Sequence, residues 1–283
     1  MTMASRCPKD GANLYDPSAS LYLEKEAEFG YVVFNRTDKK NAVSMDMWRR
    51  LPDCVKALDQ DADVKVIILK SAAAGVFCAG ADIAEFTAIA KDEALCEEQR
   101  LAIRVGQRSL ARCHKPTIAM IDGPCVGAGC GISLHCDFRY ASERATFGIT
   151  PAKLGLVYPL NDTKHLVDLV GPSFAKEILF SARLFSAEEA LKMGLVNHIF
   201  TSEQLEVEVA NFASKLASVS QYALVGIKKT IQCILDGQVD DDFVTSKWFT
   251  DAYQAPDHKE GVQAFLEKRK PDFTWAYGPE EHD

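Results

Sequence analysis

The chain has 283 residues, of which 47% are hydrophobic and 25% are charged. These proportions are typical of a globular protein and exclude disordered, collagen-like and small disulfide-stapled classes. The net charge of −8 and the pI near 5.4 argue against general binding of nucleic acid, which needs a basic surface. No apolar run reaches the roughly 18 residues of a membrane span, so neither a nucleic-acid nor a membrane partner is expected.

The N-terminal residues 1–16 lack the apolar segment of a secretory signal and the arginines of a transit peptide. The nine cysteines are scattered, mostly inside apolar runs, and form no C-x-x-C pair. This usage predicts buried free thiols in a cytoplasmic protein, without a metal site or a redox centre.

The first half of the chain alternates strand-like and helix-like segments. Ser44 is suited to cap a helix over Met45–Leu58, because its apolar residues recur at helical spacing. The other elements predicted here are a hairpin of residues 20–26 and 29–35, strands at Val64–Leu69 and Thr117–Ile121, and a helix over residues 91–113. Strand–helix–strand repeats of this kind predict an α/β fold with largely parallel pairing.

The chain beyond Pro172 is mostly helical in pattern, with one strand expected at Val196–Phe200. The predicted helices cover Ser173–Ser181, Ala187–Met193, Ser202–Ser218, Leu224–Leu235 and Lys259–Lys268. The last 70 or so residues are therefore expected to form a helical module that packs on a neighbouring subunit.

Two glycine-bearing turns each follow a predicted strand, at residues 77–83 and 122–131. The small residues there allow a ligand to approach the backbone closely. Two such turns side by side would offer a pair of backbone N–H donors to a carbonyl oxygen that becomes an enolate. Spacing alone also permits a simpler role in tight turns and close packing. A phosphate loop is disfavoured, because neither turn matches the known phosphate-loop or dinucleotide patterns.

Five segments resemble, in order, the enoyl-CoA hydratase/isomerase (crotonase) superfamily. They are FCAGADIAEF, IDGPCVGAGCGISLHCDFRYAS, ATFGITPAKLGL, EILFSARLFSAEEALKMGLVNHIF and AFLEKRKPDF. The resemblance runs from about Leu21 to Phe273. It implies an α/β fold whose core is a crotonase-type ββα spiral at residues 20–210. Residues 1–19 would be an N-terminal extension. Residues 211–283 would then be the C-terminal helical module that builds a homotrimer or a dimer of trimers.

The same resemblance implies an acyl-CoA thioester as substrate, with coenzyme A entering as part of that substrate and no separate cofactor. The thioester carbonyl would be held by the backbone N–H groups of Ala81 and Ala128. Residues implied to contact coenzyme A are Lys40, Ala42, Ala79, Ile83, Phe265 and Lys268, the last two reaching a neighbouring subunit's ligand. As an alternative, the lysines are only part of a solvated surface.

The chain departs from the family where hydratases carry two glutamates, because these positions fall on Gly131 and Pro151. Hydration needs a base for water and an acid for carbon, so ordinary hydratase chemistry is disfavoured. The segment from Thr150 to Tyr158 is instead similar to the TPxxLGxxY segment of methylmalonyl-CoA decarboxylases.

Decarboxylation of a malonyl-type thioester leaves an enolate that two backbone donors stabilise, and it needs no carboxylate base. Tyr158 would orient the substrate carboxylate or protonate the enolate, and Thr150 would help to hold it. One departure weakens this interpretation, because those decarboxylases carry histidine at the position of Ala81.

Simpler roles compete with these assignments. Tyr158 is alternatively a buried tyrosine bonded to a backbone carbonyl, and Thr150 the cap of a helix that begins at Pro151. His135 is expected to be a core or subunit-contact residue, and Asp162 the N-cap of a helix at Thr163. Asp82 is expected to be structural.

The leading expectation is therefore a malonyl-type acyl-CoA decarboxylase. Its rival is an enoyl-CoA hydratase/isomerase-like lyase with another base, such as Asp162 or Tyr158. A non-catalytic acyl-CoA-binding protein is the third possibility.

Overall fold

A six-stranded sheet lies at the centre of the molecule, in the order β1-β2-β3-β4-β6-β9. The computed structural model describes residues 13–89 and 91–277. The strands are β1 (Leu21–Glu26), β2 (Phe29–Phe34), β3 (Val66–Ser71), β4 (Thr117–Ile121), β6 (Phe138–Ser142) and β9 (His198–Phe200). The β1–β2 hairpin is antiparallel and every later pair is parallel, which confirms the predicted α/β pairing.

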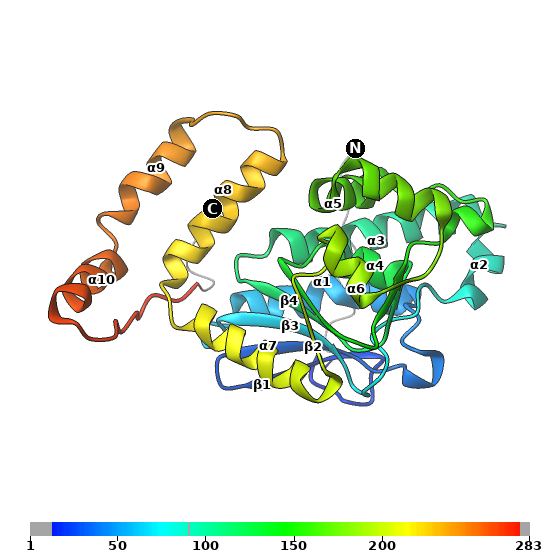
Figure 1. Cartoon of the computed structure of the whole chain (residues 1–283), viewed down its shortest axis with the longest axis horizontal. Helices are drawn as coiled ribbons and strands as arrows, with labels where there is room; N and C mark the ends of the chain where they lie inside the picture. The colour runs from blue at the N-terminus through cyan, green and yellow to red at the C-terminus, as the bar shows by residue number, and fades with distance from the viewer. Residues whose placement is uncertain (1–12, 90, 278–283) are drawn as a thin grey trace.

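Helices cover both faces of this sheet (Figure 1). On β3, Ile67 and Leu69 belong to the apolar cluster that contains α1 (Met45–Gln60). Val66 and Ile68 point the other way, into a cluster completed by α7 (Ser202–Ala217). A strand buried on both faces has this uninterrupted apolar sequence, and its burial is the main source of its stability.

A second, three-stranded sheet and several short helices complete the core. Its strands are β5 (Pro124–Val126), β7 (Thr146–Gly148) and β8 (Phe185–Ser186), in the order β5-β7-β8. The remaining core helices are α2 (Ile83–Ile89), α3 (Glu93–Arg112), α4 (Ala128–Leu134), α5 (Leu160–Ser181) and α6 (Ala187–Met193). Helix α5 is kinked at Gly171, whose φ of 75° and ψ of 164° are not helical.

Three C-terminal helices form an arm that projects from the core (Figure 1). They are α8 (Gln221–Leu235), α9 (Phe243–Ala252) and α10 (Pro256–Glu267). Lys228 of α8 ties the arm to the core, because its Nζ lies 2.7 Å from Asp137 Oδ2 and also donates to the Lys115 carbonyl. The predicted helical C-terminus is present, and its role in oligomerisation remains a prediction.

The sequence prediction missed the elements with weak periodicity. Helix α9 contains threonines and large aromatics at irregular spacing, although the capping box of Asp242 and Thr245 marks its start. The strands β5 to β8 were missed as well, because short strands carry too few residues for a clear period. The helix expected at Thr163 is present as α5, which begins at Leu160. Ser44 does cap α1, accepting from the Met47 N–H.

The domain boundaries need adjustment at both ends. The expected break between residues 210 and 211 falls inside α7, where Val209 and Ala213 pack on the same face of the sheet. The break in packing therefore follows α7. Residues 1–12 of the expected extension lie outside the described residues, but Leu14 packs on the core and its carbonyl accepts from the Leu23 N–H at 2.8 Å.

Within the described ranges, no helix has the length and apolar character needed to cross a membrane. The cysteines described there are all free thiols, and six of them are buried: Cys54, Cys78, Cys113, Cys125, Cys130 and Cys136. Cys7 lies outside the described residues. The same ranges contain no cluster of three or more metal-ligating side chains.

Candidate active site

The two glycine-bearing turns are joined directly through their backbones. The Cys78 N–H donates to the Pro124 carbonyl at 2.8 Å, and the Val126 N–H donates to the Cys78 carbonyl at 2.9 Å. This short parallel bridge follows from the order of the sheet, since β3 and β4 are neighbours and each turn continues one of them. The predicted juxtaposition of the two turns is therefore present.

Ala81 and Ala128 follow the glycines of these turns. Gly80 and Gly127 both adopt positive φ, at 125° and 52°, a backbone conformation that favours glycine. Among the described residues, neither the Ala81 nor the Ala128 N–H has a backbone acceptor. Both N–H groups are therefore available to a ligand, and their role as oxyanion donors remains a prediction.

Gly131 stands one turn further along α4, on the same face as Ala128. A Cβ atom there would lie 2.9 Å from Gln107 Nε2, 3.2 Å from Asp162 Oδ1 and 3.3 Å from the Tyr158 hydroxyl. The space beside Gly131 is thus filled by three polar side chains from α3, from α5 and from the segment before α5. Because two of them can carry protons, this is the chemical centre of the candidate site.

Asp162 is buried, with 2% of its surface exposed, and its Oδ1 accepts a 2.6 Å hydrogen bond from Gln107 Nε2. Burial raises the pKa of Asp162 to about 6, and the bond from Gln107 opposes part of this rise by stabilising the carboxylate. The expectation that Asp162 is an N-cap is wrong. Helix α5 begins at Leu160 with Pro159 as its N-cap, so Asp162 lies within the first turn and faces inward.

The Tyr158 hydroxyl is buried and has no hydrogen-bond partner among the described residues. The alternative in which Tyr158 is bonded to a backbone carbonyl is therefore wrong. Burial first, and the charge of Asp162 second, raise the pKa of Tyr158 well above its usual value. The phenol remains protonated at neutral pH, and its hydroxyl is a free donor among the described residues.

His135 is a buried, neutral histidine of the core, as expected. Its Nδ1 lies 2.6 Å from the Gly131 carbonyl, and the Asn161 amide lies 2.9 Å from its Nε2. A donor at Nε2 places the ring proton on Nδ1, facing the carbonyl. Burial and the neighbouring His165 lower the pKa of His135 to about 3, so the ring does not serve as a base near neutral pH.

Thr150 and Pro151 open a short 3₁₀ turn, Pro151–Leu154, that leads toward Tyr158. Thr150 occupies the N-cap position but its side chain makes no capping hydrogen bond, which corrects the expectation of a simple cap. Its proposed role in holding a substrate carboxylate remains a prediction.

Four of the residues expected to contact coenzyme A meet at the first turn. The Ala79 N–H donates to the Lys40 carbonyl at 2.9 Å, the Ala42 carbonyl accepts from Arg36 at 2.7 Å, and Ile83 follows the turn with 69% of its surface exposed. An ion pair of 2.8 Å between Arg36 and Asp82 ties the two segments together. The structural role expected for Asp82 is confirmed.

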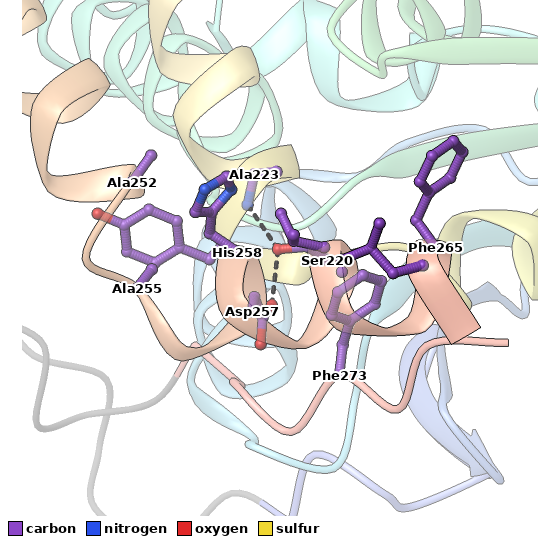
Figure 2. A pocket seen from close by; sticks show the side chains of 12 residues that line it. Ser220, Ala223, Ala252, Ala255, Asp257, His258, Phe265 and Phe273 are labelled. Atoms are coloured by element: carbon purple, nitrogen blue, oxygen red, sulfur yellow. Dashed lines mark hydrogen bonds between the residues drawn. The ribbon is translucent and has the colours of Figure 1, made fainter. Parts of the chain in front are cut away.

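Phe265 and Lys268 lie instead on the arm, away from α4 (Figure 1). Phe265 is 84% exposed and borders an apolar pocket of about 410 Å³ between α8 and α10. Figure 2 shows this pocket, with Phe265 and Phe273 at one end and the Ser220–Asp257 hydrogen bond beneath it. The structure therefore does not bring these two residues to the chain's own site.

Gln107 is the site residue that the sequence prediction missed. It occupies the buried stripe of α3 between Ile103 and Leu110, at helical spacing. A polar residue on an apolar stripe is the signal that could have found it, because a buried amide needs a partner.

A family model described as enoyl-CoA hydratase/isomerase matches residues 24–276. Together with the fold and the paired turns, this match shows that the chain belongs to the enoyl-CoA hydratase/isomerase (crotonase) family, whose members process acyl-CoA thioesters.

Individual relatives agree with this assignment. The crotonyl-CoA hydratase of Syntrophomonas wolfei is 34% identical, over 90% of this chain and 97% of its own. The peroxisomal Delta(3,5)-Delta(2,4)-dienoyl-CoA isomerase of Arabidopsis thaliana is 34% identical, over 86% of this chain and 92% of its own. A solved structure assigned to the same family, from Hyphomonas neptunium, has a TM-score of 0.89 at 36% identity and covers 92% of this chain and 99% of its own. These comparisons do not show the expected nearness to methylmalonyl-CoA decarboxylases.

The contact between α4 and the first turn predicts the effect of Gly129→Ala. A Cβ on Gly129 would lie 2.5 Å from the Cys78 carbonyl oxygen, so the two turns must separate. We expect the free energy of unfolding to fall by about 1–3 kcal/mol in urea titrations. The matched control is Gly226→Ala in α8, where a Cβ meets nothing within 4 Å. Equal stability of the two variants would contradict the close packing of the turns.

Proposed function

We propose that this chain is an enoyl-CoA hydratase-type lyase in which Asp162 and Tyr158 take the roles of the two glutamates of the family. The observation that carries the proposal is the convergence of Asp162 Oδ1 and the Tyr158 hydroxyl on the space beside Gly131. A carboxyl with a pKa of about 6 is largely ionised at neutral pH, as a general base must be. The hydratase names of relatives such as the crotonyl-CoA hydratase support the same reaction.

The backbone donors would stabilise the charge that develops on the thioester. When water adds to C3 of a 2-enoyl-CoA, the double-bond electrons move onto the thioester oxygen and form an enolate. The N–H groups of Ala81 and Ala128 would hold that oxygen, and they do not need to reorganise. Removing one such donor typically costs about 10²–10³ in turnover.

The two side chains would handle the protons. Asp162 takes a proton from water as the water oxygen bonds to C3. The Tyr158 hydroxyl protonates C2. Asp162 then returns its proton to the Tyr158 oxygen, which restores both groups. The pKa of Tyr158, raised by burial, keeps the phenol protonated until the enolate forms.

Decarboxylation of a malonyl-type acyl-CoA is the second candidate. The unpartnered hydroxyl of Tyr158 favours it, because a buried donor can bind a substrate carboxylate. The ionised carboxyl of Asp162 opposes it, since two carboxylates at one site repel each other. The two candidates therefore predict opposite pH dependence, and this difference decides between them.

The pH profile and Asp162→Asn test the proposed base. Because Asp162 must be ionised, hydration of crotonyl-CoA should rise as pH increases through about 6 and then level off. Asp162→Asn should lower the rate about 10²–10⁴-fold, measured by loss of enoyl absorbance. Release of CO₂ from methylmalonyl-CoA or malonyl-CoA, faster below pH 6, would establish the second candidate instead. Binding of these esters without turnover of any would indicate a non-catalytic protein.

Tyr158→Phe tests the proton donor. We expect kcat for crotonyl-CoA to fall by about 10² and the binding of coenzyme A to stay nearly intact, because only the hydroxyl is removed. Tyr15→Phe, at an exposed position, serves as the matched control. An unchanged kcat in Tyr158→Phe would remove this residue from the mechanism.

We propose further that the arm assembles copies of this chain into a trimer or a dimer of trimers. Its helices expose large apolar side chains, including Phe249, Phe265 and Leu266. Phe265 and Lys268, remote from their own site, would then reach the coenzyme A of a neighbouring copy. Light scattering should give three or six times the mass of 31.2 kDa, and a fully active monomer would contradict the assembly.

A further inference from the structure

Gln107 is a buried amide of α3 that donates a hydrogen bond to Asp162 of α5. Only 3% of its surface is exposed, and its Nε2 lies 2.6 Å from Asp162 Oδ1. The same nitrogen would lie 2.9 Å from a Cβ on Gly131. Gln107 therefore projects from α3 toward Gly131 of α4 and Asp162 of α5, and its nitrogen contacts the carboxyl oxygen that is near Gly131.

The direction of this hydrogen bond restricts where a proton can reside. An amide nitrogen only donates, so Asp162 Oδ1 must accept in both protonation states. A proton taken up by Asp162 therefore has to occupy Oδ2. A donor held at one oxygen also limits rotation of the carboxyl, which would otherwise exchange its two oxygens.

We propose that Gln107 is a positioning residue that fixes the Asp162 carboxyl and directs its transferable proton to Oδ2. The proposal rests on the proposed function, in which Asp162 carries the proton. In this arrangement Gln107 acts through the Asp162 carboxyl, to which its amide donates. Its contribution is to keep Asp162 ionised and correctly oriented at neutral pH.

Two neighbouring titratable groups do not obscure this effect. His135, whose Nδ1 lies 4.0 Å from Asp162 Oδ1, has its pKa lowered to about 3. Tyr158 has its pKa raised well above 10. Neither group changes charge between pH 5 and 9. The ring of His165 lies 4.0 Å from that of His135 and burial lowers its pKa, so the NMR titration of the Asp162 carboxyl itself is needed to assign the limb.

The test is the pH–rate profile of Gln107→Leu with crotonyl-CoA. The acid limb is the low-pH part of the profile, where the rate rises as Asp162 ionises. Loss of the Gln107 donor to the Asp162 carboxylate should move this limb to higher pH by about one unit or more. The rate at pH 6 should then fall about fivefold or more and recover toward pH 8. KM should change little, because the coenzyme A contacts are untouched. A ¹³C NMR titration of the Asp162 carboxyl should show the same displacement without any substrate.

Gln232→Leu is the matched control, because it removes a 3.1 Å hydrogen bond from a glutamine to Asp236 on the exposed side of α8. Its acid limb should stay in place. Gln107→Glu is the second variant if Gln107→Leu fails to fold. Two carboxyls 2.6 Å apart cannot both ionise, so this change should also move the limb to higher pH.

The outcomes separate this proposal from the function on which it rests. If Asp162→Asn abolishes hydration while both Gln107 variants keep the original acid limb and NMR titration, Gln107 is not a positioning residue. If Asp162→Asn retains full activity, the proposed base is wrong instead. A rate loss in Gln107→Leu that is equal at all pH values also overturns the proposal, since a purely structural role predicts it.

Discussion

The parallel backbone bridge between Cys78 and Cys125 is the contact on which the candidate site depends. It joins the turns after β3 and β4, so the positions of Ala81 and Ala128 are set by the sheet. Side chains would prevent the two turns from lying this close. A Cβ on Gly123 would lie 2.3 Å from the Gly75 carbonyl oxygen, and a Cβ on Gly129 would lie 2.5 Å from the Cys78 carbonyl oxygen. Small residues are therefore required at these positions by the backbone, before any substrate is considered.

The absence of a side chain at Gly131 makes room for the carboxyl of Asp162. A side chain on residue 131 would collide with the polar atoms that surround it, and removing it leaves room for a carboxyl from α5. Under the proposed function, the proton-carrying group would lie on α5 instead of α4, and the backbone donors would keep their places. A site of this kind can change its acid–base groups without changing how it stabilises an enolate.

Much of this arrangement could be predicted from the sequence, and the exceptions have physical causes. The apolar runs of β3 and β4 and the glycines after them identify the paired turns. The Asp162 prediction failed because an aspartate near a helix start resembles a cap, and only the fold shows that it faces inward. Gln107 lies 55 residues from its partner, a contact that no local pattern contains.

The buried carboxyl of Asp162 has a consequence for the stability of the whole molecule. Its pKa in the folded chain, about 6, lies above its ordinary value of 3.8, so the native state holds a proton that the unfolded chain has already released. The contribution of this residue to folding therefore weakens as pH rises from about 4 to 6, by roughly 2–3 kcal/mol. The ionised form needed by a base is thus the form that the fold tolerates least.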